Sequence, residues 1–310
     1  MTIEVQLDGV THINIYSKSK VSLGRALTNM CLYTFEYNGL TFHSVEQAWH
    51  YYKFLNRNEV VAKAILNMDD PYAIKKYAKP YNNEFTVAYV QTKEFHSLIK
   101  DVIIHRLKQD QDLCLQLRNS HLPFEHYYAF GNDKTGYKVV DESDKYGWLI
   151  KIFTEFRQDL WLEYLDDLLS KHGHMCYNKA TAPTNAIYVG RGSYFKNITY
   201  GNPFPVSDSI KAIKKTDRNI FDIAVAHSVI KYRSHLIGEI RKNPRMWYEA
   251  LNNLKNNPLQ CFCNNGKDSR LFGGGFCHSL ILSHFAENVD EIYLKTGLIQ
   301  NDNVRKNCSS

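Results

Sequence analysis

The most constraining stretch of the sequence joins a hairpin signal directly to a helix signal. Residues 33–42 (YTFEYNGLTF) alternate around Asn38-Gly39, two residues that tolerate the positive φ angles of a type I′ turn. From Ser44 the apolar spacing becomes helical, with Gln47 three residues later, which is the spacing of a capping box. We therefore expect a strand hairpin followed at once by a helix over residues 44–56.

The rest of the first half is predicted to be mostly helical. A short strand is expected near residues 13–16, and a loop is expected to hold Pro123 and Gly131-Asn132. Residues 171–185 are polar, contain Gly173 and Pro183, and show no periodicity, which is typical of a linker. The helical patterns span residues 59–67, 71–78, 84–108, 110–119 and 147–169.

The second half alternates strand and helix patterns. Residues 186–189 are typical of a buried strand, and further segments follow at 217–242 (helix), 244–256 (helix), 259–263 (strand) and 277–287 (helix). This order indicates a small α/β domain. The sequence therefore predicts an α+β protein: a helix-rich domain with a small N-terminal sheet at 1–170, a linker at 171–185, and a smaller basic α/β domain at 186–310.

Length and composition limit the class of protein. A chain of 310 residues fits two domains. It has no apolar run of about 18 residues and no secretory signal at its N-terminus. Seven cysteines, an odd number scattered through apolar segments, argue against a disulfide framework. We expect a soluble, cytoplasmic protein without membrane partners.

Charge divides the chain unevenly. Residues 1–170 hold 19 Lys+Arg against 22 Asp+Glu, a net −3, whereas residues 171–310 hold 19 against 10, a net +9. A basic domain attracts nucleic acid or a phosphorylated ligand, with nearby Tyr232 and Trp247 as candidates for stacking on bases. A solvated helix face fits equally well. The basic residues in question are Lys211, Lys214, Lys215, Arg218, Lys231, Arg233, Arg241, Lys242 and Arg245.

The predicted helix 44–56 carries three ionisable residues on one stripe. Glu46, His50 and Lys53 are spaced i, i+4 and i+7, whereas the rest of the helix is strongly aromatic. Spacing by itself favours an ordinary solvent-facing stripe. The alternative is that a carboxylate and an ammonium are presented together into a pocket.

Several motifs, in order, resemble the NADAR (YbiA-like) family. Residues 27–29 (LTN), 37–47 (YNGLTFHSVEQ) and 53–54 (KF) are similar to its pattern S-N-F…G-x-x-F-x-S-x-E-H…Q…K-F. Looser similarity continues at 129–131 (AFG), 144–147 (DKYG) and 156–160 (FRQDL). The resemblance covers about residues 11–165 and implies a YbiA-like fold for the first domain.

The resemblance implies a hydrolase that cleaves N-glycosidic bonds to ribose. Its substrate class is ADP-ribosylated guanine in nucleic acid or a ribosylated pyrimidine intermediate, and no cofactor is implied. Cleavage builds positive charge at C1′ and requires a nucleophile on the opposite face, so a carboxylate is the minimum catalytic equipment. Glu46 is the candidate for that role. Lys53 is the second catalytic candidate, holding a ribose phosphate or attacking an opened sugar as an amine.

The same motifs suggest substrate-binding residues and also departures from the family pattern. Asn29 is expected to orient a sugar hydroxyl and Arg25 to clamp a phosphate. Phe130-Gly131 stands where the family has Trp-Gly, with Phe130 stacking on the base. His50 replaces the usual Gln, Asp144 the usual Asn, and Tyr127 stands where an acidic residue is frequent. These departures leave an alternative open: a catalytically degenerate module that binds ADP-ribose or another NAD-derived ligand, coupled to a nucleic-acid-binding domain.

The second half carries motifs of its own. The series YVGR (188–191), GNPF (201–204), CFC (261–263) and CH (277–278) resembles a small family of uncharacterised bacterial and phage domains. Thiolate and imidazole ligands suit zinc. The spacing is nevertheless unlike that of common zinc fingers and favours buried cysteines beside an ordinary histidine, so no metal is expected. The zinc candidates are Cys261, Cys263, Cys277 and His278.

Overall fold

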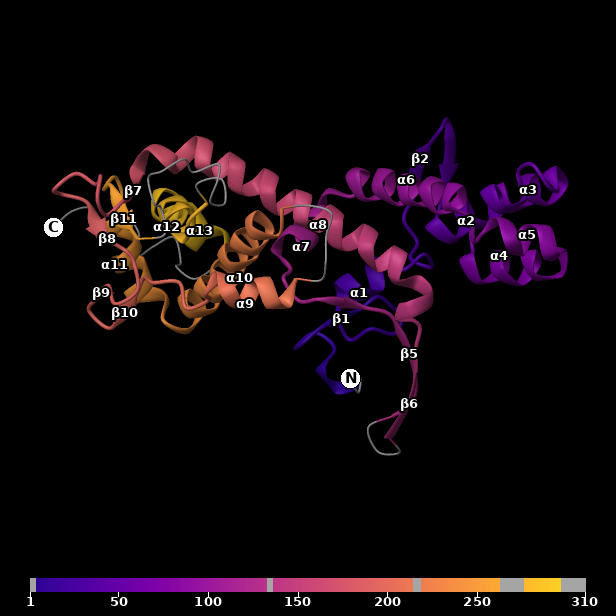
Figure 1. Ribbon diagram of the computed structural model, residues 1–310, viewed down its shortest axis with the longest axis horizontal. Coiled ribbons are helices and arrows are strands. Elements are labelled where there is room, and N and C mark those ends of the chain that lie inside the picture. Colours follow the sequence, from indigo (N-terminus) through magenta and orange to yellow (C-terminus); the bar gives the residue numbers. More distant parts are fainter. Residues whose placement is uncertain (1–3, 133–135, 214–218, 263–275, 297–310) are drawn as a thin grey trace. The chain divides into compact units, whose positions relative to one another are not determined.

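The computed structural model describes residues 4–132, 136–213, 219–262 and 276–296. It forms an α+β structure, as predicted, and divides into two compact units, Met1–Arg157 and Gln158–Ser310. The long helix α8 (Ser143–His172) begins in the first unit and ends in the second (Figure 1). Within the described ranges, no helix combines the length and hydropathy needed to cross a membrane.

The predicted hairpin is present as β2 (Phe35–Tyr37) and β3 (Leu40–Phe42). Its two strands pair antiparallel with Tyr37 opposite Leu40, which leaves a two-residue turn. Asn38 and Gly39 have φ angles of 51° and 75°, the left-handed backbone that a type I′ turn requires. The sequence prediction for this turn is confirmed.

Helix α2 (Val45–Phe54) begins where the sequence predicts, but its cap is only half of a capping box. The Ser44 side chain accepts a hydrogen bond from the backbone N–H of Gln47 at 3.1 Å. The Gln47 side-chain oxygen accepts from the N–H of His43 at 2.6 Å. The Gln47 amide donates to carbonyls at and just beyond the end of the next helix, α3 (Glu59–Leu66), among them that of Met68 at 2.8 Å. The buried glutamine thus ties the start of α2 to its neighbour as well as capping it.

Helix α2 is the centre of the first unit. Nine of its ten residues are buried, because α3, α4, α5, α6 and β3 all pack against it. Figure 1 shows these helices gathered around α2. The helices of this unit are α1 (Ser22–Ala26), α3 (Glu59–Leu66), α4 (Pro71–Ala78), α5 (Glu84–Tyr89), α6 (Lys93–Gln109) and α7 (Gln111–Asn119), with short 3₁₀ turns η1 (Val5–Leu7) and η2 (Lys79–Tyr81).

The single helix predicted over residues 84–108 is two helices. Helix α5 ends at Tyr89, and Thr92 starts α6 by accepting a hydrogen bond from the N–H of Phe95 at 3.2 Å. The Thr92 hydroxyl also donates to the Tyr89 carbonyl at 2.7 Å. Such local side-chain bonds compete with helical ones, and they break the helix inside an otherwise continuous periodic pattern.

A buried polar network joins the N-terminal strand to a segment more than 100 residues later. Strands β1 (Ile13–Asn14) and β4 (Phe124–Glu125) pair in parallel. The Asn14 side chain exchanges two hydrogen bonds with the backbone of Tyr127, each of 3.1 Å. The Asp8 carboxylate accepts three hydrogen bonds at 2.8–2.9 Å, one of them from the N–H of Asn14. This network fixes residues 15–18 beside residues 126–128.

The segment predicted as a loop around Gly131-Asn132 is a hairpin. Strand β5 (Tyr127–Asn132) pairs antiparallel with β6 (Gly136–Asp141). Helix α8 follows, with non-helical backbone at Tyr146 near its start. The hairpin and the kinked start of α8 place Tyr128 and Tyr146 in the same region of the first unit.

The second unit contains a three-stranded parallel sheet in the order β7-β11-β8. Strand β7 (Cys176–Asn178) lies in the segment expected to be a linker, and it pairs with β11 (Leu259–Cys261). Strand β8 (Ile187–Tyr188) pairs with the other edge of β11. A small antiparallel hairpin is formed by β9 (Tyr194–Phe195) and β10 (Ile198–Thr199).

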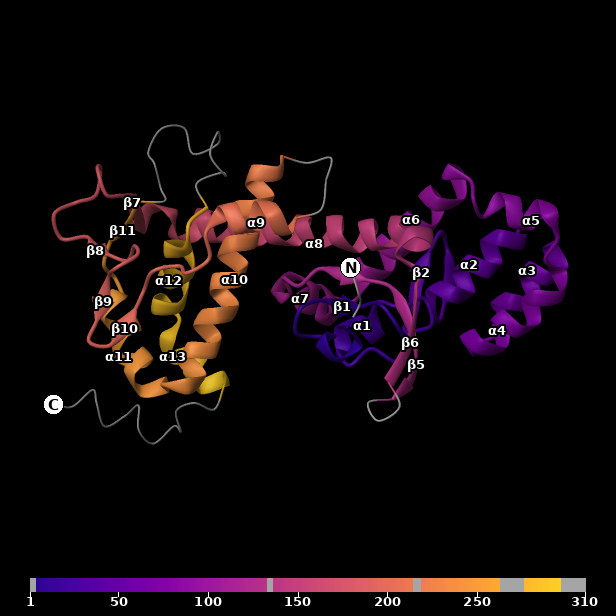
Figure 2. The same cartoon turned by 60° about the horizontal axis from the view of Figure 1, so that its bottom comes forward.

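Helices cover this sheet and enclose the core of the second unit. Helix α12 packs on β7 and β11 and contacts α10 and α11, and Figure 2 shows α10 and α12 side by side. Trp161, Leu165 and Leu168 of α8 belong to the same core. The helices of this unit are α9 (Val206–Ala212), α10 (Ile220–Lys242), α11 (Pro244–Leu254), α12 (His278–Glu287) and α13 (Val289–Lys295), with the 3₁₀ turn η3 (Gly173–Met175).

Candidate functional site

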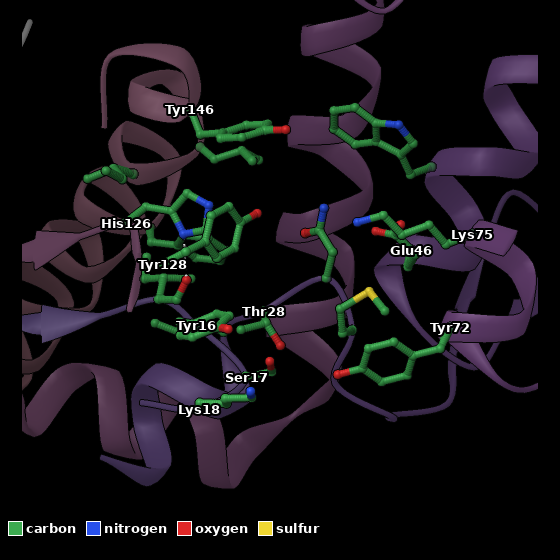
Figure 3. Close-up of a pocket in the computed structure, with 18 of the residues that line it drawn as sticks. Tyr16, Ser17, Lys18, Thr28, Glu46, Tyr72, Lys75, His126, Tyr128 and Tyr146 are labelled. Carbon is green, nitrogen blue, oxygen red and sulfur yellow. Dashed lines mark hydrogen bonds between the residues drawn. The ribbon is translucent and has the colours of Figure 1, made fainter. Parts of the chain in front are cut away.

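A cavity of about 570 Å³ lies within the first unit. Its size falls in the range of about 300–1,000 Å³ typical of small-molecule sites. Figure 3 shows Glu46 and Lys75 on one side of the space and His126 and Tyr128 on the other. The walls come from the segment after β1, the loop after α1, helices α2 and α4, the start of β5 and the start of α8.

The acidic group in the cavity wall is Glu46, at the N-terminal turn of α2. Glu46 is only 8 % exposed. Its Oε1 lies 3.2 Å from Nε2 of His50, which is one helical turn further along. The carboxylate also benefits from the positive end of the helix dipole. Asn29 lines the same cavity, and its backbone carbonyl accepts a hydrogen bond of 2.9 Å from the N–H of Glu46 at the start of the helix.

The geometry defines the tautomer of His50. A donor at Nε2 is needed for the hydrogen bond to the Glu46 carboxylate, and the buried Nδ1 has no hydrogen-bond partner within the described part of the chain. A neutral ring protonated at Nε2 satisfies both conditions, because Nδ1 then carries only a lone pair. His50 therefore orients the carboxylate through its Nε2–H.

The solvent-facing interpretation of the helix stripe is wrong. Glu46, His50 and Lys53 are all buried, with exposed fractions of 6–8 %. Spacing could not show this because helices α3–α6 cover α2 from several sides. Two of the three, Glu46 and His50, line the cavity, and Lys53 does not.

Lys53 points to a different partner. Its Nζ donates a hydrogen bond of 2.5 Å to the side-chain oxygen of Asn82. Burial lowers the pKa of the Lys53 ammonium from its ordinary value, and the charge of Glu46 acts in the opposite direction. The Lys53 amine thus interacts electrostatically with the Glu46 carboxylate, although it does not line the same cavity.

Four further residues expected to bind substrate lie outside the cavity lining. Arg25 is exposed on α1 and donates to the Ser19 carbonyl at 2.6 Å. Phe130 is 55 % exposed, and Asp144 is exposed at the start of α8. Gly131 has a φ of 119°, and a Cβ there would collide with the carbonyl oxygen of Gly136. The backbone of the hairpin therefore requires glycine at position 131.

Tyr127 stands where the resembled family frequently has an acid, and here it belongs to the structural network. It is fully buried, and its hydroxyl lies 2.8 Å from Nε2 of His12. The neighbouring residue, Tyr128, is the one that lines the cavity. Alternation along β5 explains this difference, because adjacent side chains of a strand point to opposite faces.

Aromatic side chains that the sequence did not single out form much of the wall. Tyr16, Trp49, Tyr128 and Tyr146 line the cavity and are half-buried. Tyr16 packs edge-on against Tyr128 at a ring-centroid distance of 5.2 Å. Burial raises the pKa of Tyr128 to about 12, with the charges of Tyr146, Glu142 and other neighbours acting in the same direction. Its hydroxyl therefore stays protonated and able to donate a hydrogen bond at neutral pH.

His126 provides a second imidazole in the wall. Its Nδ1 lies 2.7 Å from the carbonyl oxygen of Ile15, so this nitrogen carries the proton. Burial lowers the pKa of His126 from its ordinary value, against the effect of that hydrogen bond and of nearby Glu142. The ring therefore favours its neutral form, with Nε2 as an acceptor.

Two lysines lie among the lining residues where the cavity meets solvent. Lys18 and Lys75 are exposed and line the cavity, together with the exposed Tyr72. Neither lysine forms an ion pair with a carboxylate in the portion of the chain that the structure describes. An acid inside and two cations at the opening suit a ligand that carries an anionic group.

In the second unit, three of the four zinc candidates come together. The Nδ1 of His278 lies 3.5 Å from Sγ of Cys277 and 3.9 Å from Sγ of Cys261. All three residues are buried. Cys263 lies outside the described residues. Among the described cysteines, none forms a disulfide.

The two aromatic residues expected to stack on bases beside the basic residues of the second unit are buried. Tyr232 and Trp247, the expected stacking residues, are buried at 1 % and 4 % exposure, so they cannot stack on bases. Several cations have acidic partners, as in Lys242–Glu239 at 2.8 Å and Arg245–Glu249 at 3.8 Å. Lys214, Lys215 and Arg218 lie outside the described residues.

Comparisons with known proteins give two matches. A family model described as a domain of unknown function (DUF4326) matches residues 174–288. Among solved structures, the NMR structure of the E. coli protein YbiA is similar, with a TM-score of 0.35 and 16 % sequence identity, over 53 % of this chain and 96 % of that chain. Among curated proteins, no sequence matches significantly.

Proposed function

We propose that the first unit is a hydrolase that cleaves the N-glycosidic bond between a base and ribose. The observation that carries this proposal is the buried Glu46 carboxylate, hydrogen-bonded to His50 and placed in the wall of a cavity of about 570 Å³. The resemblance of the surrounding motifs to the NADAR family supports the same activity. The substrate class is an ADP-ribosylated guanine or a ribosylated pyrimidine.

The chemistry assigned to Glu46 follows from the bond that breaks. As the C1′–N bond opens, its electron pair leaves with the base and positive charge develops at C1′, which a nearby carboxylate stabilises. A water molecule then adds its hydroxyl to C1′. Glu46 accepts the proton released by that water, and the proton finally resides on the departing base nitrogen, so the reaction is a balanced hydrolysis.

The remaining walls suit the two other parts of such a substrate. Tyr16, Tyr128 and Trp49 offer aromatic faces and edges for a base. Lys18 and Lys75 offer ammonium groups for phosphate oxygens. Asn29 offers a side-chain amide for a sugar hydroxyl. In this proposal the base lies against the tyrosines and the phosphates lie toward the two lysines.

The test is release of ADP-ribose from an oligonucleotide that carries ADP-ribosylated guanine, measured by liquid chromatography and mass spectrometry. A ribosylated pyrimidine is the parallel substrate. We expect release by the unaltered chain and a loss of about 10²–10⁴-fold in Glu46→Gln, an isosteric change that removes the carboxylate. Glu59→Gln is the matched control, because Glu59 is an exposed helix-start acid on α3.

Two results would contradict the proposal. One is full activity in Glu46→Gln. The other is tight binding of ADP-ribose by the unaltered chain without release from either substrate, which would identify the first unit as a binding module.

A further inference from the structure

A second site lies in the other unit and is independent of the proposed hydrolase. Its three side chains, Cys261, Cys277 and His278, are 1–2 % exposed. Their potential ligand atoms all lie within 4.8 Å of one another. We propose that these residues bind a zinc ion.

The distances between the side chains match the ligand spacing of a tetrahedral zinc ion. Zn–S bonds of about 2.3 Å and Zn–N bonds of about 2.0–2.1 Å, at tetrahedral angles, separate sulfur from nitrogen by about 3.6 Å. The observed separations of the His278 Nδ1 from the two sulfurs are 3.5 and 3.9 Å. Both sulfur–nitrogen separations are therefore close to the spacing of two ligands on one zinc ion.

The imidazole of His278 is held in the tautomer that a metal needs. Its Nε2 donates a hydrogen bond of 2.8 Å to the backbone carbonyl of Val189, so the proton is on Nε2 and the lone pair of Nδ1 faces the sulfurs. A carbonyl that accepts from the far nitrogen is the usual outer partner of a metal-bound histidine. The ring of Tyr232 packs edge-on against the imidazole at 5.1 Å and fixes its plane.

The topology brings the three ligands together at the carboxyl end of the parallel strands. Cys261 ends strand β11, and Val189 follows the parallel strand β8. Cys277 is the N-cap of α12 and His278 its first residue. A bound zinc ion would tie β11 to α12 and, through Val189, to β8.

A nearby cysteine serves as the internal control. Cys176 on β7 is buried like the other two, and burial raises its pKa to about 12. It does not belong to the cluster of ligand atoms. Cys176→Ser therefore removes a buried thiol from the same sheet without removing a proposed ligand.

The test measures metal binding by the full chain. Protein purified under reducing conditions is analysed for zinc by mass spectrometry, then stripped with a chelator and titrated with Co²⁺ alone. We expect about one metal ion per chain, with thiolate-to-cobalt charge-transfer absorption and the visible bands of a tetrahedral site. Cys261→Ser, Cys277→Ser and His278→Asn should lose this spectrum, and Cys176→Ser should keep it.

If a variant fails to fold, zinc binding is tested on the unaltered chain instead. Chelation of its zinc should lower the thermal unfolding temperature, and added Zn²⁺ should restore it. Two results would overturn the proposal. One is a chain with neither zinc nor a cobalt spectrum. The other is a Cys261–Cys277 disulfide in protein purified without oxidant, detected as a loss of two hydrogen masses.

Discussion

Nε2 of His50 lies 3.2 Å from Oε1 of Glu46, one turn apart on a helix that is buried on nearly every side. The imidazole acts here as a donor that fixes the direction of the carboxylate. We expect His50→Asn to lower kcat about tenfold with little change in KM, since the shorter side chain cannot maintain the bond. His50→Gln retains an N–H donor and should recover most of the rate. Equal losses in both variants would contradict this positioning role.

The two lysines at the opening of the cavity should contribute to substrate binding through charge. We expect Lys18→Met and Lys75→Met each to raise KM about tenfold, which corresponds to about 1.4 kcal/mol, while kcat changes little. The effect should shrink as salt is added, because both groups are exposed. Lys76→Met is the matched control, since Lys76 is an exposed neighbour that does not line the cavity. An equal rise in KM for Lys76→Met would contradict a specific role of Lys18 and Lys75 in substrate binding.

Lys53 should behave as a buried structural cation. Its folded-state pKa is lowered from 10.5 by burial, so the unfolded chain binds its proton more tightly. Stability then rises with pH through the window between the lowered value and 10.5. We expect Lys53→Met to be at least as stable as the unaltered chain at pH 7 and to lose that rise, as measured by urea unfolding. Borohydride should trap no sugar on Lys53, and an adduct there would show that the amine reaches the substrate.

The hydrogen-bond network around Asp8 should hold the cavity walls together. Asp8 is 6 % exposed and accepts from the N–H groups of Asn14 and Lys20 and from the Ser19 hydroxyl. We expect Asp8→Asn to lower the free energy of unfolding by about 2–4 kcal/mol. The three donors would lose their charged acceptor, and the new side-chain NH₂ group would point at one of them. Asp69→Asn, whose side chain is 83 % exposed, should change it by less than about 0.5 kcal/mol. Urea unfolding followed by tryptophan fluorescence measures both.

The second unit should lose stability in mild acid because of His284. Burial and the nearby charges of His172 and Arg233 lower the pKa of His284 from 6.5 to about 4. The unfolded chain therefore takes up a proton first, and stability falls as pH drops from 6.5 toward 4, by up to about 3 kcal/mol. His284→Gln should flatten this dependence, whereas the exposed His235→Gln should not. An unchanged acid profile in His284→Gln would contradict the prediction.

Local signals in the sequence were sufficient for the elements that carry Glu46. The Asn38-Gly39 turn and the Ser44 cap depend on residues a few positions apart, and both lie where predicted. The break between α5 and α6 was missed because apolar spacing continues through it, whereas Thr92 interrupts the helix with its own hydrogen bonds.

The residues that line the cavity could not be predicted from such local signals. Its tyrosines and His126 meet Glu46 only through pairing between segments far apart, such as the contact of His126 with Ile15 across 111 positions. Phe130 was selected because it matched a motif, but it lies nearer the turn of the hairpin and is 55 % exposed, whereas Tyr128, two residues earlier on β5, lines the cavity. The burial of Tyr232 and Trp247 likewise depends on how α10 and α11 pack together.

The order in which the cavity walls occur along the chain has a consequence for biosynthesis. The acid on α2 leaves the ribosome well before Tyr128 and Phe153, which complete the walls. A nascent or prematurely terminated polypeptide that ends before β5 carries Glu46 without an enclosed site around it. The proposed hydrolysis would then begin only after translation has passed the start of α8, because the walls around Glu46 are complete only at that point.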